Sequence, residues 1–462
     1  MKVKNLTIAA IATGLSRSPI GIIRISGSNT FEIIAKIFSF KNKNKNITNI
    51  SNASISLGTI HNTSNIIDEA LLSIFKSPDS YTGEDMAELS CHGNPLIMRK
   101  IMETLIINGA NLAFPGDFTR RAFLNGKMDL TKAEAVSDIV SARTEAALKI
   151  SVNQLFGAEK IVIEDLRNGI IELLAMLEAD IDFEQDDVTS NLLALTSSFE
   201  AIIISITNFI KSAEKGLLIK EGAKVTITGR PNAGKSSLLN ALTGFNRAIV
   251  TDIPGTTRDT IEETIIIDNI PVILTDTAGI RQASNPIEEE GIKRAKVAIV
   301  SADVVIFTMD VSSPITNEDK LLYAEILNKP HIIVLNKTDM TKAFDATSLT
   351  SILKAEAPII SVSALKNENI NNLTKTIKAI IIKSKDLNDE NEPAISALRH
   401  KTALDSALKD IAEGLLCINN NSSYETAAEH VKAAAASVSL ITGEIATEDV
   451  LDKIFSNFCI GK

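Results

Sequence analysis

The sequence predicts a multidomain α+β and α/β fold. Three observations predict it: residues 1–124 mix short β-like runs with helical segments, residues 218–383 alternate apolar strands with helices, and the chain is helical on both sides of that block. The length of 462 residues suits about three domains. Because domain termini usually lie close together, we expect residues 125–217 and 384–462 to form one discontinuous all-α domain around the inserted α/β domain.

Composition narrows the class of protein. The net charge is −10 and the sequence pI is about 5.3, which excludes a protein that binds nucleic acid over its whole surface, so an RNA partner needs a local basic patch. The cysteines Cys91, Cys417 and Cys459 are too far apart for a CxxC metal site, and their odd number excludes a complete disulfide framework. We expect a cytoplasmic protein, and no run of 18 apolar residues predicts a transmembrane helix.

The N-terminal α+β domain is predicted from its local patterns. The runs TIAAIA and GIIRIS read as paired strands, ASISLGTI and EALLSIF as further strands, and helices are expected around residues 30–38 and 95–108. Downstream, Thr131 and Glu134 have the spacing of a capping box, which predicts that the first helix of the all-α domain begins there. In the inserted domain the strands AKVTIT, PVILT, VVIFTMD, HIIVL and IISV are nearly all apolar, as in a mostly parallel sheet covered on both faces.

A phosphate-binding loop follows the strand AKVTIT. Gly229, four further residues and then Gly234-Lys235-Ser236 fit the pattern G-x-x-x-x-G-K-[ST], and SSLLNAL opens a helix directly after it. Backbone N–H groups and the helix N-terminus are expected to bind phosphate oxygens. Lys235 is expected to reach the outer phosphates, and the Ser236 hydroxyl to bind Mg²⁺.

Three further strand ends carry matching chemistry. Asp276-Thr277-Ala278-Gly279 places a carboxylate near the magnesium and a glycine N–H near the terminal phosphate. Asn336-Lys337-Thr338-Asp339 offers an aspartate that accepts the two N–H donors of guanine, and Ser363-Ala364-Leu365 offers a backbone N–H for the guanine oxygen. In order and context these elements resemble the TRAFAC-type GTPases. The resemblance implies that the inserted domain of this chain is a P-loop GTPase domain.

The catalytic machinery departs from that pattern. The water-orienting glutamine that Ras-like enzymes place after DxxG is Ile280 here, and a cis or trans arginine finger is not evident. We expect carbonyl groups around Thr251 and Ile253, with the Asn232 side chain, to hold a monovalent cation in its place. Thr257 is expected to give Mg²⁺ a second hydroxyl. The acidic run Glu288–Glu290 is either a carboxylate source for positioning water or a solvated helix start.

Several longer motifs resemble one family. GRPNAGKSS, TDIPGTTRD, DTAGIR, FTRRAFLNGKMDL, YTGEDMAEL and FCIGK occur in the order and context of the MnmE (TrmE) family of tRNA-modification GTPases. The resemblance implies an N-terminal domain of the folate-binding aminomethyltransferase type that also dimerises, and K⁺-dependent GTP hydrolysis. It further implies a homodimer that works with the flavoprotein MnmG to place a carboxymethylaminomethyl or aminomethyl group on C5 of the wobble uridine of certain tRNAs.

The resemblance also assigns residues. It places Glu288 on the hydrolytic water. It places K⁺ on Asn232, Thr251, Ile253 and Thr256, and Mg²⁺ on Ser236 and Thr257. It places 5-formyltetrahydrofolate on Arg24, Glu88, Lys127 and Lys462. GTP is expected to contact the residues of the nucleotide motifs: Asn232, Ala233, Gly234, Lys235, Ser236, Ser237, Thr251, Asp252, Ile253, Pro254, Gly255, Thr256, Thr257, Asp276, Thr277, Ala278, Gly279, Asn336, Lys337, Asp339, Ser363, Ala364 and Leu365.

Two positions are special. Pro254 stands where many members of the family have alanine, and we expect its fixed φ to stiffen the potassium loop without removing the site. Cys459 is left without a role, because a cysteine is most often a small packed residue.

Two other functions are compatible with parts of the sequence. One is a regulatory or ribosome-assembly GTPase whose flanking domains bind RNA or protein, and the other is a folate-dependent aminomethyltransferase in which GTP is only structural. The residues that the resemblance assigns to folate and the terminal CIGK argue against the first, and a test of folate binding by the isolated N-terminal segment would discriminate. Modification that proceeds with a non-hydrolysable GTP analogue favours the second.

Overall fold

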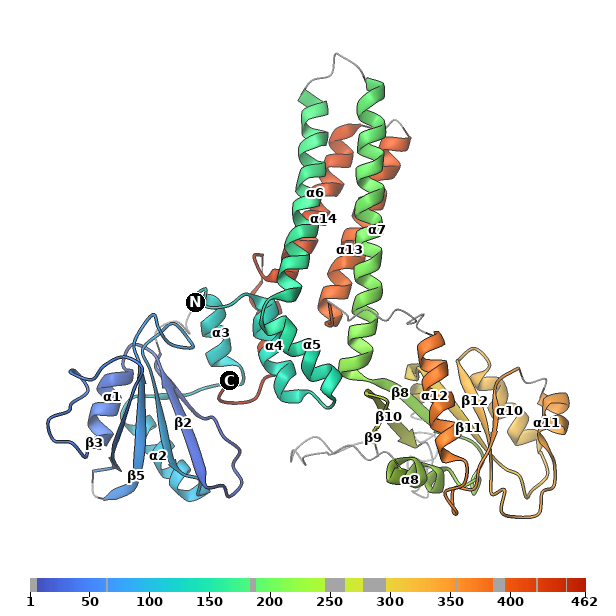
Figure 1. Cartoon of the computed structure of the whole chain (residues 1–462), viewed down its shortest axis with the longest axis horizontal. Coiled ribbons are helices and arrows are strands. Elements are labelled where there is room, and N and C mark those ends of the chain that lie inside the picture. The colour runs from blue at the N-terminus through green and yellow to red at the C-terminus, as the bar shows by residue number, and fades with distance from the viewer. Residues whose placement is uncertain are drawn as a thin grey trace, which may run out of the picture. The chain divides into compact units, whose positions relative to one another are not determined.

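The computed structural model describes most of the chain (Figure 1). It divides into two compact units, and each unit gathers segments that are far apart in sequence. The first unit comprises the chain up to Val140, Gln154–Glu164 and Ala436–Lys462; the second comprises Ser141–Asn153 and Asp165–Ala435. The described residues are 6–63, 65–182, 188–245, 262–276, 296–353, 356–384, 395–420, 423–445 and 447–462.

Seven strands of the first unit form one sheet in the order β3-β4-β5-β6-β2-β1-β7. Neighbouring strands are antiparallel except β1 and β7, which are parallel. The predicted pairing of TIAAIA with GIIRIS is confirmed, because these runs are β1 and β2. The strands are β1 (Ile8–Ile11), β2 (Ile20–Ser26), β3 (Phe38–Phe40), β4 (Ser54–His61), β5 (Ile66–Phe75), β6 (Met86–His92) and β7 (Asn111–Leu112).

One face of this sheet is covered by α1 (Thr30–Ile37) and α2 (Pro95–Ile107), which confirms the two helices expected in this region. Side chains alternate between the faces of a strand. In β2, Ile23 and Ile25 are therefore fully buried under the helices, while Arg24 between them points to the other face and is half-buried. The register of β2 and β6 places Arg24 directly opposite Glu88 on that second face.

The end of the sequence packs against the N-terminal segment within the first unit. Gly116, with φ of 73°, precedes α3 (Asp117–Leu124), and a Cβ at this glycine would lie 2.7 Å from the Phe455 carbonyl oxygen of α15 (Glu448–Phe455). Arg120 of α3 forms an ion pair with Asp452 at 2.6 Å. Beyond α15, the Phe118 amide donates to the Lys462 carbonyl oxygen at 3.3 Å. The residues 458–462 are called the C-terminal tail below.

Helices that precede and follow the α/β segment pack together in the second unit, side by side in Figure 1. They are α6 (Ala158–Asp182), α7 (Val188–Glu221), α13 (Leu398–Asn419) and α14 (Tyr424–Thr442). A Cβ at Gly414 of α13 would lie 3.0 Å from Cε1 of Phe199 of α7, so the two helices approach closely. Lys432 of α14 pairs with Glu178 of α6 at 3.4 Å. These contacts bear out a helical layer built from both sides of an insertion.

The first helix of this region, α4 (Leu130–Ser141), is followed by α5 (Glu145–Leu155). The predicted capping box of Thr131 and Glu134 is wrong. The Asp129 carboxylate accepts from the backbone N–H of Lys132 at 2.9 Å and from the Thr131 hydroxyl at 2.6 Å. Asp129 is therefore the capping residue, and Thr131 lies inside the first turn, because a nearby aspartate satisfies the same free N–H groups.

α7 has an unusual composition. Its residues Leu192–Glu221 are long and apolar enough to cross a membrane, with a mean hydropathy of 1.6, and 22% of the most apolar 18-residue stretch is buried. The same length and composition occur in core helices of soluble proteins, and α7 packs along α13. No continuous run of 18 apolar residues occurs in it, because serine, threonine and charged residues interrupt the pattern.

The second sheet has the order β13-β12-β11-β8-β10-β9. All neighbouring pairs are parallel except β9 and β10, so the prediction of a mostly parallel sheet is confirmed. The strands are β8 (Ala223–Thr228), β9 (Glu262–Ile267), β10 (Ile270–Asp276), β11 (Val304–Asp310), β12 (His331–Asn336) and β13 (Ile359–Ser361). The helices are α8 (Lys235–Phe245), α10 (Asn317–Ile326), α11 (Ala346–Leu353) and α12 (Ile370–Ser384).

Two short connections fix this sheet to its surroundings. Asp268 and Asn269, both at positive φ, form the two-residue turn between β9 and β10, a geometry that favours Asp and Asn. Gly222 alone separates α7 from β8; its φ is 87°, and a Cβ there would lie 2.5 Å from the Pro271 carbonyl oxygen. Because the parallel strands all run the same way, their carboxyl ends meet at one edge, where ligands bind in open α/β sheets.

Candidate functional sites

The phosphate loop lies at that edge, between β8 and α8, and its glycines are required by close contacts. Gly229 has a φ of 143°, and a Cβ there would be 2.2 Å from the Thr308 carbonyl oxygen of β11. Gly234 has a φ of 89°, and its Cβ would be 2.2 Å from Nδ2 of Asn336. No side chain is compatible with either position. The motif therefore encodes the path of the backbone as well as its chemistry.

Lys235 is 5% exposed and its ammonium is held by the loop itself. Its Nζ donates to the carbonyl oxygens of Gly229 at 2.9 Å and Arg230 at 2.7 Å. Arg230 is fixed in turn by an ion pair with the buried carboxylate of Asp319 at 2.8 Å. The positive charge thus lies within the curve of the loop, where the free backbone N–H groups of a helix N-terminus already favour an anion.

A pair of oxygen ligands lies beside the loop. The Ser236 hydroxyl donates to Oδ2 of Asp276 at 2.8 Å, and Asp276 ends β10 and is 4% exposed. Hydroxyl and carboxylate oxygens are the ligands that Mg²⁺ prefers, and with nucleotides the ion takes its remaining ligands from phosphate and water. Among the described residues, no group of three or more His, Cys, Asp or Glu side chains is arranged to hold a metal. The pair therefore fits a metal that arrives with phosphate.

The predicted guanine end is assembled around Asn336, which is 2% exposed. Its Nδ2 donates to the Ala233 carbonyl oxygen at 3.0 Å, and its Oδ1 accepts from the Ala364 N–H at 3.1 Å. The Ser363 hydroxyl donates to Oδ1 of Asp339 at 2.6 Å and lowers the pKa of that carboxyl, which keeps it charged. One buried amide thus joins the phosphate loop to the residues that are predicted to bind guanine.

Lys337 and the adjoining cavity complete this end. Lys337 has a φ of 66°, and its ammonium pairs with Oδ2 of Asp310 at 2.6 Å. Burial raises the pKa of Asp310, but hydrogen bonds from Lys337 and Ser312 lower it by more. A cavity of about 440 Å³ opens between α8 and the loop after β13. Its lining residues are Ser237, Asn240, Ala241, Gly244, Ala364, Leu365 and Asn367.

A second cluster of charged residues lies on the face of the seven-stranded sheet opposite α1 and α2. Nε of Arg24 donates to Oε1 of Glu88 at 2.7 Å, and Nη1 donates to the Gly461 carbonyl oxygen at 3.1 Å. Burial lowers the pKa of Lys462, and the positive charge of Arg24 lowers it further. Two half-buried cations and a carboxylate are therefore brought together from β2, β6 and the C-terminal tail. An anion placed between the cations relieves their repulsion.

Lys127 contacts a different part of this site. Its Nζ donates to the Pro78 carbonyl oxygen at 3.0 Å, on the loop that joins β5 to β6. Residues 77–85 of that loop are called the β5–β6 loop below. Of the four predicted residues, Arg24 and Glu88 are in direct contact and Lys462 lies close enough to Arg24 for their charges to repel. Lys127 contacts the β5–β6 loop.

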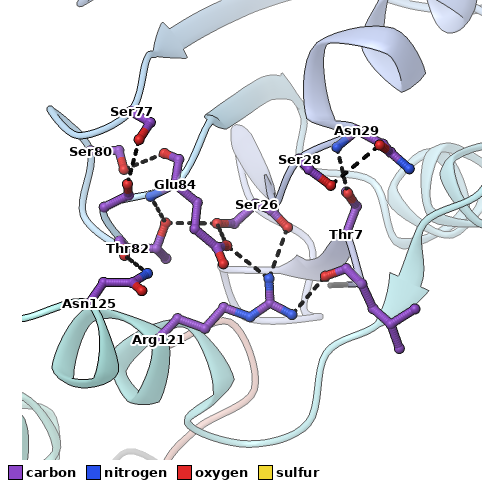
Figure 2. A network of polar contacts seen from close by, with 12 residues as sticks. Thr7, Ser26, Ser28, Asn29, Ser77, Ser80, Thr82, Glu84, Arg121 and Asn125 are labelled. Atoms are coloured by element: carbon purple, nitrogen blue, oxygen red, sulfur yellow. Dashed lines mark hydrogen bonds and ion pairs between the residues drawn. The ribbon is translucent and has the colours of Figure 1, made fainter. Parts of the chain in front are cut away.

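A partly buried ion pair fixes the β5–β6 loop (Figure 2). Nη1 of Arg121 pairs with Oε2 of Glu84 at 2.8 Å, and Nη2 donates to the Leu6 carbonyl oxygen at 2.8 Å. The Ser26 hydroxyl lies 2.8 Å from the same Glu84 oxygen and 2.7 Å from the Thr82 hydroxyl. The loop is thereby tied to α3 and to the end of β2.

These residues were not found by sequence reasoning. Arg121 and Glu84 fall within the family motifs, but no local pattern indicates that they meet across 37 residues. Arg121 is 5% exposed, although arginine is rarely buried unless it is paired. The only sequence signal is an arginine on the apolar side of the short helix FTRRAFL.

Two family models match this chain, one over its N-terminal region and one over most of the remainder. The model of the MnmE helical domain matches residues 130–459, and that of the N-terminus of the GTP-binding protein TrmE matches residues 7–127. A tRNA modification GTPase MnmE from Desulforamulus reducens is 40% identical over 460 residues, which is 99% of each chain. The chain belongs to the MnmE family. The counterpart from Aquifex aeolicus is 42% identical over 460 residues, 98% of this chain and 99% of that one.

Membership of the MnmE family confirms the predictions of the family and of a GTPase, together with the P-loop domain. Among solved structures, a variant of Aquifex aeolicus Era bound to GDP and AlF4⁻ is 30% identical over 41% of this chain and 66% of that chain, with a TM-score of 0.29.

Part of the predicted nucleotide site lies outside the described residues. This holds for the first switch segment, for the residues after Asp276 and for the water-positioning glutamate. The residues are Thr251, Asp252, Ile253, Pro254, Gly255, Thr256, Thr257, Thr277, Ala278, Gly279, Ile280 and Glu288.

Proposed function

We propose that this MnmE-family chain is a potassium-activated GTPase that works with the flavoprotein MnmG. Together they add a carboxymethylaminomethyl or aminomethyl group at C5 of the wobble uridine of certain tRNAs. One observation carries the proposal: the phosphate loop, Asp276, Asn336–Asp339 and Ser363–Leu365 converge at one sheet edge in a chain related along its length to tRNA modification GTPases.

GTP binding uses the convergent residues in distinct roles. Backbone N–H groups from Asn232 to Ser237 and the Lys235 ammonium bind phosphate oxygens. Because two carbonyls already hold Lys235, its charge needs little reorganisation when the nucleotide binds. Asp339 accepts from the guanine N–H groups, and Ser236, Asp276 and Thr257 hold Mg²⁺. The bound ion neutralises charge that develops between the outer phosphates.

The potassium site is proposed at the phosphate loop, with Asn232, Thr251, Ile253 and Thr256 as ligands. Asn232 has a φ of 64°, and its amide makes no hydrogen bond within the described part of the chain, so its oxygen is available for a cation. A monovalent ion there supplies the positive charge that an arginine finger supplies elsewhere. Glu288 is proposed to orient the attacking water.

The first unit is proposed to bind 5-formyltetrahydrofolate or a related tetrahydrofolate at Arg24, Glu88, Lys127 and Lys462. Arg24 and Lys462 suit an anionic group of a folate, and the Glu88 carboxylate, 2.7 Å from Nε of Arg24, orients that guanidinium. The chemistry of these side chains supports the assignment, because both signs of charge are half-buried within one cluster.

The assembly is proposed to be a cytoplasmic homodimer that associates with MnmG, GTP and tRNA, with no role for a membrane. The proposal divides the chain at residues 1–124, 125–217, 218–383 and 384–462 into a folate-binding and dimerisation domain, two parts of a helical domain and the GTPase domain between them. The net charge of −10 favours tRNA contact that lies largely on the partner.

The guanine site is tested by Asp339→Asn. An amide that replaces the carboxylate pairs with xanthine better than with guanine, because xanthine carries an oxygen where guanine carries its amino group. GTP affinity is expected to fall by at least about 100-fold while xanthosine triphosphate gains affinity. The ratio of the two affinities is its own control for folding. An unchanged preference for GTP contradicts the proposed role of Asp339.

Hydrolysis is tested in K⁺ and in Na⁺. The wild-type chain is expected to turn over GTP much faster in K⁺, and Glu288→Ala is expected to bind GTP normally while turnover falls by about 100-fold or more. Equal rates in the two salts oppose the potassium site.

The whole proposal is tested by mass analysis of wobble uridines in cells that lack this chain, with and without a complementing copy. The C5 substituent is expected to vanish and to return with the wild-type copy. A chain that acts only as a regulatory GTPase leaves these uridines unchanged.

A further inference from the structure

The Arg24 guanidinium is constrained on several sides. Besides its bonds to Glu88 and Gly461, its Cζ lies 5.9 Å from the centroid of the Tyr81 ring. A guanidinium at this distance over an aromatic face gains electrostatic attraction from the ring. Within the described residues, Nη2 of Arg24 has no hydrogen-bond partner, so two of its donors are available to a ligand.

Tyr81 is itself anchored. Its hydroxyl lies 2.9 Å from the hydroxyl of Thr119, a fully buried residue of α3. Its ring packs against an apolar cluster that contains Ile8, Ala10 and Phe118. The ring is therefore fixed at its edge and along its side, and it has little freedom to move away from Arg24.

The β5–β6 loop that carries Tyr81 is also fixed. Figure 2 shows Arg121, Ser26 and Asn125 converging on Thr82 and Glu84, the residues just after Tyr81. Asn125 donates to the Thr82 carbonyl oxygen at 2.7 Å. A loop held by a partly buried ion pair and several hydrogen bonds places its aromatic ring reproducibly, which a solvated loop does not.

We propose that Tyr81 is a positioning residue of the N-terminal site: it holds the Arg24 guanidinium between Glu88 and the C-terminal tail, with its free donors turned toward the ligand. The inference rests on the proposed folate site. It adds a residue that acts through Arg24, without requiring that Tyr81 touch the folate.

The first experiment needs no ligand. The arginine Nε–H signals are recorded by ¹⁵N NMR in the full chain, and the Arg24 signal is assigned by its loss in Arg24→Lys. Tyr81→Leu is expected to shift this signal and to speed its hydrogen exchange several-fold, whereas Tyr81→Phe keeps the ring and leaves it close to wild type. An unmoved Arg24 signal in Tyr81→Leu overturns the inference.

The second experiment is a double-mutant cycle on the affinity for 5-formyltetrahydrofolate. Tyr81→Leu is expected to weaken binding about tenfold in the wild-type background and less than twofold when Arg24→Ala is already present. Tyr81→Phe restores most of the affinity. Losses that multiply independently mean that Tyr81 does not act through Arg24, and they overturn the inference.

Two controls separate this inference from the proposed function. Tyr424→Leu changes a tyrosine of the second unit and is expected to leave folate affinity and the Arg24 signal unchanged. GTP hydrolysis is likewise expected to stay at the wild-type rate in Tyr424→Leu. If the wild-type chain binds no 5-formyltetrahydrofolate, the folate site is refuted, and the Arg24 signal still decides the role of Tyr81.

Discussion

Arg24 and Lys462 are like charges held in one half-buried cluster. The pKa of Lys462 is lowered by burial and by the positive charge of Arg24, so its ammonium loses a proton at a pH below the ordinary value of 10.5. A neutral amine no longer attracts an anion. The affinity of the proposed folate site for an anionic ligand is therefore expected to depend in part on the protonation of Lys462.

We predict that the affinity for 5-formyltetrahydrofolate falls as pH rises through that lowered pKa. Lys462→Arg is expected to remove this loss up to about pH 10, because the guanidinium stays protonated. Lys409→Arg, at an exposed position of α13, serves as the matched control and keeps the wild-type profile. Titration calorimetry at increasing pH, up to the ordinary lysine value of 10.5, measures the effect; a wild-type profile that stays flat over this range contradicts it.

Single residues differ in how well the sequence predicts them. Lys235, Ser236 and the two glycines were predictable, because a short contiguous motif fixes both the backbone path and the ligand groups. Arg121 and Tyr81 were not predictable, because their roles depend on α3 meeting the β5–β6 loop in the folded chain. Patterns of local sequence carry no record of such a meeting.

At the scale of elements, helix ends show the same distinction. The start of α4 was predicted within one or two residues, but its cap was assigned to Thr131 when Asp129 accepts the N–H of Lys132. Both side chains can cap a helix, and only the backbone conformation decides between them. Among the strands, β6 was overlooked, although Ala87, Leu89 and Cys91 alternate with polar residues and are buried.

Asp129→Ala is predicted to destabilise the first unit by about 1 kcal/mol, because the first turn of α4 loses its side-chain acceptor. Asp165→Ala, at an exposed position within α6, is the control and is expected to change the free energy of unfolding by no more than about 0.5 kcal/mol. Urea unfolding followed by circular dichroism measures both. Equal effects of the two substitutions contradict the assignment of the cap.

The C-terminal tail depends on Gly461. Its φ is 93°, and a Cβ there would lie 2.8 Å from Cα of Ala12 and 2.8 Å from the carbonyl oxygen of Ile11. We predict that Gly461→Ala displaces the tail from Arg24 and weakens folate binding by about tenfold or more. Gly109→Ala is the control, since Gly109 has a φ of 107° with nothing within 4 Å. It is expected to cost backbone strain alone and to leave folate affinity unchanged.

At the scale of the whole molecule, each proposed ligand belongs to a different compact unit. The residues of the proposed folate site lie in the first unit, and those of the proposed GTP site lie in the second. A ligand that binds only the folded form stabilises the unit that holds it by RT ln(1 + [L]/Kd), about 2.7 kcal/mol at 100 times Kd. The two ligands therefore report on separate parts of the fold.

Thermal unfolding is predicted to resolve two transitions. GDP with Mg²⁺ is expected to raise one by about 5 °C, and 5-formyltetrahydrofolate the other. ADP replaces GDP as the control and is expected to shift neither, because adenine lacks the paired donors that Asp339 accepts. Differential scanning calorimetry distinguishes these outcomes. A single transition that both ligands raise equally contradicts independent units.

The overall class was predictable because each domain type has its own hydrophobic period along the chain. The mostly parallel sheet was predictable because its strands are apolar on both faces. In β11, for example, the consecutive residues Val304, Val305 and Ile306 are all fully buried. The edge strand β9 was not, since it pairs antiparallel with β10 through a two-residue turn whose sequence, Asp268-Asn269, lacks glycine.

Gly222 connects the long helix α7 directly to the sheet of the second unit. Its 34 residues extend about 50 Å at 1.5 Å per residue. Only Gly222 separates its end from β8, the strand that leads into the phosphate loop. Because no flexible linker lies between α7 and β8, a reorientation of a few degrees at Gly222 displaces the opposite end of α7 by several ångströms.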